Sequence, residues 1–327
     1  MKHKKILLPA IIFIIISALL ILFSLSMGTI FISPVEIFAG ITGTEPVPEN
    51  FIIVKMRLIR IILAITVGAS LAVSGVMFQS LLKNPLADPF IIGVSSGAAL
   101  GATAAIVLSM ANIYIVLFSF IGGLVTITLI YFMSKRLKFG TSSMILAGIA
   151  LSFIFSAAVL LLYSAAKAEH VHKAIMWLMG DLSIARYSIL TEISIAAAIL
   201  ILISMLYYKH LDIISFGHSF SKNLGVTEKD VAAIFWIASL LAALSVSLCG
   251  IVGFVGLIIP HVIRLFFGPA HIRLIPLSAL AGGLFLMTAD TFARSAVPPY
   301  EIPVGIITNF FGGIFFLIFI FHKRNAV

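Results

Sequence analysis

The chain has 327 residues, of which 61% are hydrophobic and only 10% are charged, and its formal net charge is +9. A soluble domain carries about 25% charged residues, so this composition excludes a water-covered globule and indicates that the bilayer is the solvent. The positive charge does not indicate nucleic acid, because lysine and arginine of membrane proteins collect in cytoplasmic loops.

Ten apolar segments predict membrane-spanning helices, which require about 20 residues each. We therefore expect an all-α integral membrane protein with a single transmembrane domain over residues 1–327. No stretch is long enough for a separate soluble domain. The expected spans are 7–27, 57–82, 92–110, 114–134, 143–166, 191–208, 229–249, 253–267, 274–296 and 304–321, of which the eighth is short.

The N-terminal stretch resembles a signal peptide, because Met1-Lys-His-Lys-Lys precedes an apolar run from Ile6 to Leu25. That run is longer than the roughly 7–15 residues of a signal peptide, and no A-x-A cleavage site follows it. We therefore expect a retained first helix.

The lysines and arginines predict the orientation. If the N-terminus is cytoplasmic, fourteen of them lie on the inner side and seven on the outer side. This bias predicts that both termini are cytoplasmic. A missed early helix would reverse the assignment.

Three outer arginines need a specific interpretation. Arg57 and Arg60 lie three residues apart and share a helix face, and Arg294 lies at the outer end of the ninth span. Long basic side chains often anchor helix ends at the membrane interface, so anchoring is one interpretation. Contact with an external partner is the other.

Residues 75–101 predict a turn followed by a tightly packed helix. Two Asx-Pro pairs, Asn84-Pro85 and Asp88-Pro89, interrupt the helical pattern. Gly93, Gly97 and Gly101 then form a stripe on one helix face, which is typical of close helix packing in lipid. No strand precedes these glycines, so they do not predict a phosphate-binding loop.

The outer loop 167–187 contains His170 and His172. Two histidines at this spacing could share a metal ion on a strand. The loop instead predicts a short amphipathic helix, on which they would point apart, so no metal site is expected.

The inner loop 209–230 is the longest polar stretch between spans on that side. Phe216 and Phe220 recur among its polar residues, as in short helices that lie on a membrane surface. Such a loop would suit a cytoplasmic partner.

Two further segments break the simple pattern of spans. Residues 250–264 contain three glycines and Pro260, which predict a broken or kinked helix. Asp290 and Arg294 are spaced to pair on one helix face, as ionisable groups within spans usually do.

Four ordered blocks closely resemble the permease family of type II ABC importers, which carry iron-siderophores, cobalamin or haem. The resemblance extends from Ile53 to Ile320. The blocks are MRLIRIILAITVGASLAVSGVMFQSLLKNPLADPFIIGVSSGAALGA, WLMGDL, GIVGFVGLIIPHVIRL and EIPVGIITNFFGG.

The resemblance implies a homodimer of ten-helix subunits in the cytoplasmic (inner) membrane of a prokaryote. It also implies two cytoplasmic ATPase subunits and an external solute-binding protein. Arg57, Arg60 and Arg294 match the family's outer arginines, which face glutamates of the binding protein. The loop 209–230 matches the coupling helices that receive the ATPase movement, with Phe216, Phe220, Leu224, Gly225 and Val226 as its expected contact residues.

Two departures from the family pattern are small. Leu58-Ile59 stands where the family often has a proline between the two arginines, and Gly250-Ile-Val-Gly253 stands where it often has GPIG. Neither departure changes the expected class of activity.

The chain contains no G-x-x-x-x-G-K-[ST] sequence, so a separate ATPase must supply ATP-driven transport. We expect no cofactor in this chain, and ATP with Mg in the partner ATPase.

Three functional hypotheses follow. The first is a permease for an iron-siderophore, with cobalamin or haem as alternative cargo. The second is an ion-coupled secondary transporter, which needs carboxylates or histidines near the membrane midplane; apart from Asp290, the spans have essentially none. The third, a membrane enzyme, would need such groups clustered at one depth.

Overall fold

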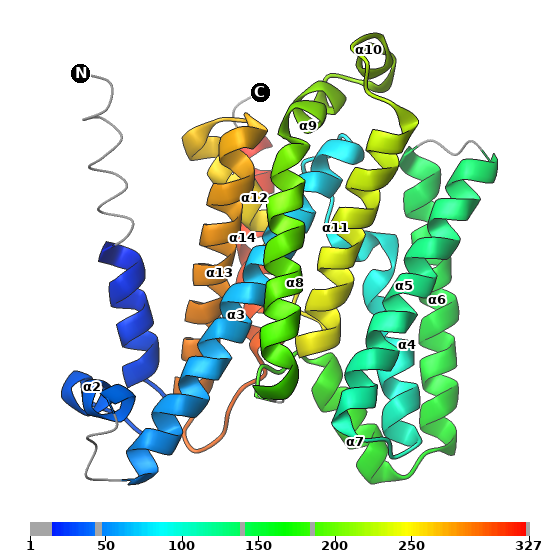
Figure 1. Cartoon of the computed structure of the whole chain (residues 1–327). Coiled ribbons are helices and arrows are strands. Elements are labelled where there is room, and N and C mark those ends of the chain that lie inside the picture. Colours follow the sequence, from blue (N-terminus) through cyan, green and yellow to red (C-terminus); the bar gives the residue numbers. More distant parts are fainter. Residues whose placement is uncertain (1–14, 43–47, 138–140, 184–186, 325–327) are drawn as a thin grey trace, which may run out of the picture.

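The computed structural model describes residues 15–42, 48–137, 141–183 and 187–324 (Figure 1). The regular structure of these residues is helical, apart from one isolated bridge between Val297 and Tyr300. The expected all-α class is therefore confirmed.

Most of the long helices run roughly parallel, as in a membrane bundle. In Figure 1, α9 and α10 mark the upper end of the bundle, and α2 and α7 mark the lower end. The longest elements are α3 (Pro48–Leu81), α5 (Asn112–Leu137), α6 (Thr141–Ala165), α8 (Tyr187–Leu206), α11 (Glu228–Cys249), α13 (His271–Ser295) and α14 (Val304–Arg324).

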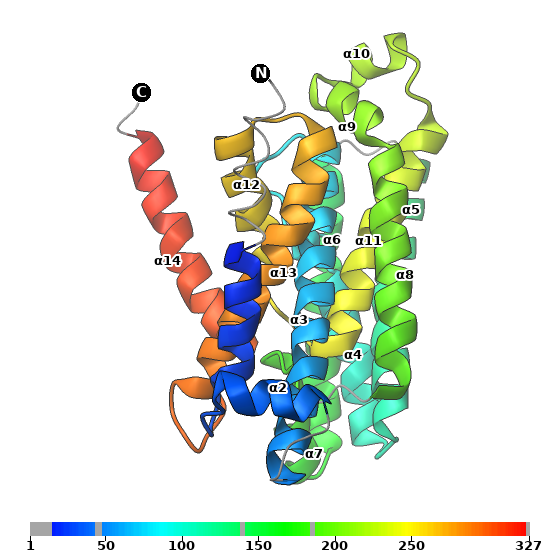
Figure 2. The same cartoon turned by 60° about the vertical axis from the view of Figure 1, so that its left-hand side comes forward.

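Shorter elements connect or flank these helices. The helix Ile15–Ser26 precedes α2, and α2 lies across the lower end of the bundle (Figure 2). The remaining short elements are α2 (Pro34–Thr42), η1 (Pro89–Ile92), α4 (Val94–Val107), α7 (Ala168–Leu178), α9 (Tyr208–Ser215), α10 (His218–Asn223) and α12 (Val255–Phe267).

The predicted spans match helices in the described residues, with boundaries mostly within the few residues expected of sequence patterns. The main exception is α3, which begins at Pro48 instead of residue 57. The first predicted span, 7–27, is described only from Ile15, because residues 1–14 lie outside the described residues.

Length and composition divide the apolar helices into two groups. Five are long and apolar enough to cross a membrane alone, and α8 with α9, bent by 59°, forms a sixth candidate. Four are shorter: Ile15–Ser26, Val94–Val107, Val255–Phe267 and Val304–Ile318. The 13 residues of α12 extend only about 20 Å, less than the roughly 30 Å of a hydrocarbon core.

The glycines within residues 250–264 predicted the break before α12. Helix α11 ends at Cys249, and Gly250 follows with a φ of 73°. Phe254, at the start of α12, also has a positive φ, of 68°. Pro260 lies inside α12, so the break comes from the residues before it.

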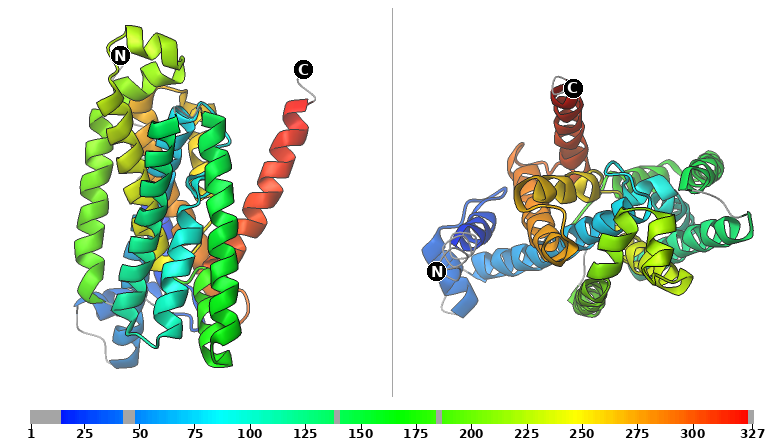
Figure 3. Two further views of the ribbon diagram at one scale, coloured as in Figure 1. Left: turned by 90° about the vertical axis from the view of Figure 1, so that its right-hand side faces the viewer. Right: turned by 90° about the horizontal axis from the view of Figure 1, so that it is seen from above.

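Helix α3 lies at the centre and packs against α11, α12 and α13. Two glycine contacts allow these backbones to approach closely. A Cβ added to Gly75 would collide with the carbonyl of Gly256 on α12, and one added to Gly68 with the carbonyl of Gly282 on α13. By contrast, α14 contacts α12 and α13 and then diverges from the bundle (Figure 3).

Candidate functional site

The lower end of the bundle holds a cluster of paired charges. Arg60 on α3 pairs with Asp290 on α13 through Nε and Oδ1 at 2.8 Å. The same guanidinium pairs with Glu301 at 2.6 Å, in the connection from α13 to α14. Asp290 also pairs with Arg294 at 3.6 Å, as their spacing predicted. These pairs tie α3, α13 and the connection from α13 to α14 together.

Two of the predicted docking arginines point into the protein. Arg57 donates from Nη1 to the carbonyls of Leu25 and Ser26, at 2.6 and 3.0 Å. Arg294 donates to the Ser24 hydroxyl at 3.0 Å and also to the Ser24 carbonyl. Both arginines therefore hold the C-terminal end of the helix Ile15–Ser26, where a positive charge complements the helix dipole.

Exposure separates the three arginines. Arg57 and Arg294 are 6% and 3% exposed. The Arg60 side chain is 12% exposed, and its partner Glu301 is 39% exposed. Docking through these arginines stays a prediction, and their contacts show what a docking carboxylate would have to displace.

The predicted coupling loop forms two short helices, as its pattern of apolar residues indicated. α9 and α10 project beyond the upper end of the bundle (Figure 1). Phe216 and Phe220 are 77% and 51% exposed, and their ring centroids lie 5.9 Å apart. Leu224 is also exposed, and Val226 is buried. Large apolar side chains exposed in a group often mark a protein contact.

Gly225 has a φ of 86°, which places the turn after α10 in the left-handed region that favours glycine. Helix α11 then begins with a capping box. The Thr227 hydroxyl accepts from the Asp230 backbone N–H, and the Asp230 carboxylate accepts from the Thr227 backbone N–H. The loop therefore joins α11 through a fixed turn.

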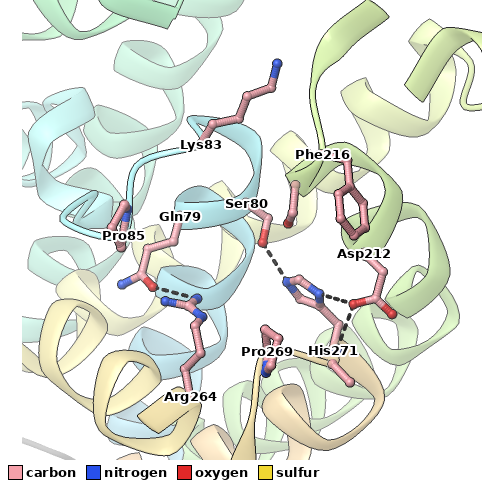
Figure 4. Close-up of a pocket in the computed structure, with 11 residues that line it drawn as sticks. Gln79, Ser80, Lys83, Pro85, Asp212, Phe216, Arg264, Pro269 and His271 are labelled. Carbon is pink, nitrogen blue, oxygen red and sulfur yellow. Dashed lines mark hydrogen bonds and ion pairs between the residues drawn. The ribbon is translucent and has the colours of Figure 1, made fainter. Parts of the chain in front are cut away.

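A cavity of about 580 Å³ lies at the upper end, beneath α9 (Figure 4). Its walls come from α3, α9, the end of α12 and the start of α13, and from the turns beside them. The lining residues are Gln79, Ser80, Lys83, Pro85, Asp212, Ser215, Phe216, Arg264, Pro269, Ala270 and His271.

Two groups of polar contacts connect the helices that form the cavity walls. Arg264 donates to Gln79 Oε1 at 3.0 Å, and this contact joins α12 to α3. His271 contacts both Asp212 and Ser80, each at 2.6 Å, and it joins α13 to α9 and α3. The contacts of His271 could not be predicted from the sequence, because Asp212 and Ser80 lie 59 and 191 residues away from it along the chain.

The turn between α3 and η1 contains an unusual carboxyl group. Asp88 caps η1 by accepting from the Phe90 backbone N–H at 2.8 Å. Burial raises the pKa of the Asp88 carboxyl to about 6, against the lowering effect of that hydrogen bond.

The predicted glycine stripe lies beside α5. Cβ atoms added to Gly97 and Gly101 would collide with the carbonyls of Gly122 and Phe118. Gly93 has a φ of 80°, at the start of α4. The packing role of these glycines stays a prediction for substitution to test.

The two histidines of the predicted outer loop lie on α7, which is the short helix predicted there. His170 Nε2 contacts the Ser109 hydroxyl at 3.2 Å. Within the described ranges, no group of three histidine, cysteine or acidic side chains could hold a metal ion.

Comparison with known proteins gives consistent matches over nearly the whole chain. The model of the FecCD transport family matches residues 14–322. A cobalamin import system permease protein of Halobacterium salinarum is 40% identical over 83% of this chain and 74% of that protein. A hemin transport system permease protein of Yersinia pestis is 36% identical over 83% of each chain.

A solved structure matches the fold as well. It is described as an inward-facing conformation of a metal-chelate type ABC transporter, and it is 30% identical to this chain. The match covers 98% of this chain and 99% of the other, with a TM-score of 0.85.

Proposed function

This chain belongs to the FecCD transport family, and we propose that it imports an iron-siderophore as the permease subunit of an ABC importer. The carrying observation is the match of sequence and fold to a metal-chelate type ABC transporter along almost the entire chain. Cobalamin and haem are the alternative cargoes, because relatives are named for each of them.

The proposed assembly contains two copies of this chain, two cytoplasmic ATPase subunits and an external solute-binding protein. The chain lacks a G-x-x-x-x-G-K-[ST] sequence, which supports a separate ATPase that binds ATP and Mg. The diverging α14 carries exposed apolar side chains, including Phe310, Phe311 and Phe315. This face would suit a second copy in the membrane.

We place the upper end of the bundle in the cytoplasm of a prokaryote, at the inner membrane. The excess of lysine and arginine on that side in the predicted topology supports this orientation. It directs α9 and α10 towards the ATPase and the lower-end arginines towards the binding protein.

Coupling is assigned to the exposed pair Phe216 and Phe220, with Leu224, Gly225 and Val226. Apolar side chains on short surface helices can insert into a groove of a partner. Movement of the ATPase would then reach the spans through α9 and the turn into α11.

Docking of the binding protein is assigned to Arg57, Arg60 and Arg294 by exchange of partners. Arg60 can exchange the half-exposed Glu301 for a carboxylate of the binding protein, because guanidinium pairs carboxylates bidentately. Arg57 and Arg294 would engage only after the end of the helix Ile15–Ser26 moves aside.

The docking assignment can be tested by reversing the three arginines to Glu and measuring binding-protein affinity in detergent. We expect docking to weaken at least about tenfold while the ATPase stays bound, because each reversed charge would face a carboxylate of the binding protein. Unchanged affinity would remove the assignment.

Cargo is tested by calorimetry on the partner binding protein, with ferric siderophore, cobalamin and haem as ligands. Tight binding of the siderophore alone supports the proposal. Tight binding of cobalamin or haem instead replaces the proposed cargo but leaves the permease assignment.

A further inference from the structure

We propose that Asp212, His271 and Ser80 form a relay that transmits movement of α9 to the spans α13 and α3. This inference rests on the proposed function, in which α9 belongs to the coupling loop. The three side chains come from three different helices and meet at the wall of the upper-end cavity (Figure 4).

Asp212 joins α9 to the first residue of α13 through two hydrogen bonds. Its Oδ1 accepts from the His271 backbone N–H at 3.0 Å and contacts the ring Nδ1 at 2.6 Å. The N-cap of α13, Ala270, offers no side-chain cap. Asp212 therefore supplies, from another helix, the acceptor that the exposed backbone N–H groups of a helix start require.

Ser80 completes the connection to the central helix. Its Oγ lies 2.6 Å from His271 Nε2 and 3.0 Å from the Val76 carbonyl of its own helix. Because an ionised Asp212 only accepts, Nδ1 carries a proton. The Ser80 hydroxyl then donates to Nε2 of a neutral ring, or accepts from Nε2–H of a charged ring and donates to Val76. Both states keep α13 joined to α3.

Burial of His271 and Ser80 makes their contacts costly to break, whereas the Asp212 side chain is 38% exposed. Ser80 and His271 are 4% and 3% exposed, so neither can readily replace its partner with water. Leu211 and Ile214 of α9 are 0% and 5% exposed, and they hold α9 in place by apolar packing. Asp212 is the polar part of this attachment.

The exposed contact surface lies one helical turn from the relay. Phe216 caps the C-terminal end of α9 four residues after Asp212, so the two side chains are neighbours, as Figure 4 shows. The cavity beside them leaves space into which α9 can tilt. A displacement applied at Phe216 must therefore carry His271 with it or break the Asp212 bonds.

The relay is tested in vesicles that contain this chain with its ATPase and binding protein, by measuring ferric-siderophore uptake per ATP hydrolysed. We expect Asp212→Ala, His271→Ala and Ser80→Ala to lower this ratio. For Asp212→Ala the loss should be about tenfold or more, the factor expected for one charge-assisted hydrogen bond. Asp212→Asn, which keeps an acceptor oxygen, should restore most of the ratio.

Ser245→Ala is the matched control for Ser80→Ala. Ser245 is also buried, at 1% exposed, and it lies outside the coupling loop, where its hydroxyl donates to the Leu241 carbonyl of its own helix, α11. Its ratio should equal that of the wild type. Co-purification of the ATPase with each variant separates uncoupling from loss of assembly.

The outcomes separate the relay from the function on which it rests. Absence of ATP-driven uptake by the wild-type complex would contradict the proposed function. Normal wild-type uptake with an unchanged ratio in Asp212→Ala and Ser80→Ala would overturn the relay alone. If the Asp212→Ala complex does not assemble, the other two variants test the relay. An unchanged ratio of uptake to ATP hydrolysis in Ser80→Ala would overturn the relay, and so would a tenfold loss of that ratio in Asp212→Asn.

Discussion

The lower-end ion pairs predict different costs for two similar substitutions. Asp290 and Glu301 pair with the same guanidinium, but their side chains are 2% and 39% exposed. Asp290→Asn leaves Arg60 and Arg294 without their buried counterion, which should cost about 3–5 kcal/mol of unfolding free energy. Glu301→Gln alters a largely solvated pair and should cost at most about 1 kcal/mol.

The assay is unfolding of the purified chain in mixed micelles, as detergent composition is shifted towards SDS. The two variants remove one charge each and are otherwise nearly isosteric, so Glu301→Gln serves as the control for Asp290→Asn. Equal losses of stability, or a loss below about 1 kcal/mol for Asp290→Asn, would refute the argument that burial makes the Asp290 pair dominant.

Three other predictions follow from single features of the fold. Gly101→Ala should destabilise the chain by about 1–3 kcal/mol in the same unfolding assay, because the added Cβ collides with the α5 backbone. Gly313→Ala is the control and should not destabilise the chain, because no atom lies near the added Cβ. Equal losses of stability in the two variants would contradict this prediction. Joint replacement of Phe216 and Phe220 by Ala should leave ATP hydrolysis but abolish most uptake in vesicles, and normal coupled uptake would show the loop assignment is wrong. Asp88 has a folded pKa of about 6, above the ordinary value of 3.8, so its contribution to stability should fall as pH rises from about 4 to 6. Melting curves of Asp88→Asn should lack this dependence, and an unaltered dependence would exclude Asp88 as its source.

Apolar length was enough to predict the positions of most of the long helices. The break before α12 was predicted from Gly250 and the glycines after it, which interrupt the apolar run. Apolar length did not predict α2, although Ser33 and Glu36 carry a signal for its start. The Glu36 carboxylate accepts from the Ser33 backbone N–H at 2.7 Å, as in a capping box.

The contacts of the candidate sites were harder to predict from the sequence than the positions of the helices. The exposed Phe216 and Phe220 followed from local spacing, because short amphipathic helices depend on neighbouring residues. The partners of Arg57 and Arg294 could not be predicted, since they are backbone carbonyls and a hydroxyl near residue 24, far along the chain. The Asp212–His271 contact likewise depends on tertiary packing alone.

We propose that this chain is a membrane conduit driven by a separate ATPase. The most direct measurement is accumulation of radioactive ferric siderophore in vesicles that contain the chain with its ATPase and binding protein. We predict accumulation only when ATP is supplied on the ATPase side, and none when a catalytically inactive ATPase is used. Equal accumulation in vesicles with the chain alone, driven by a proton or sodium gradient, would contradict the account.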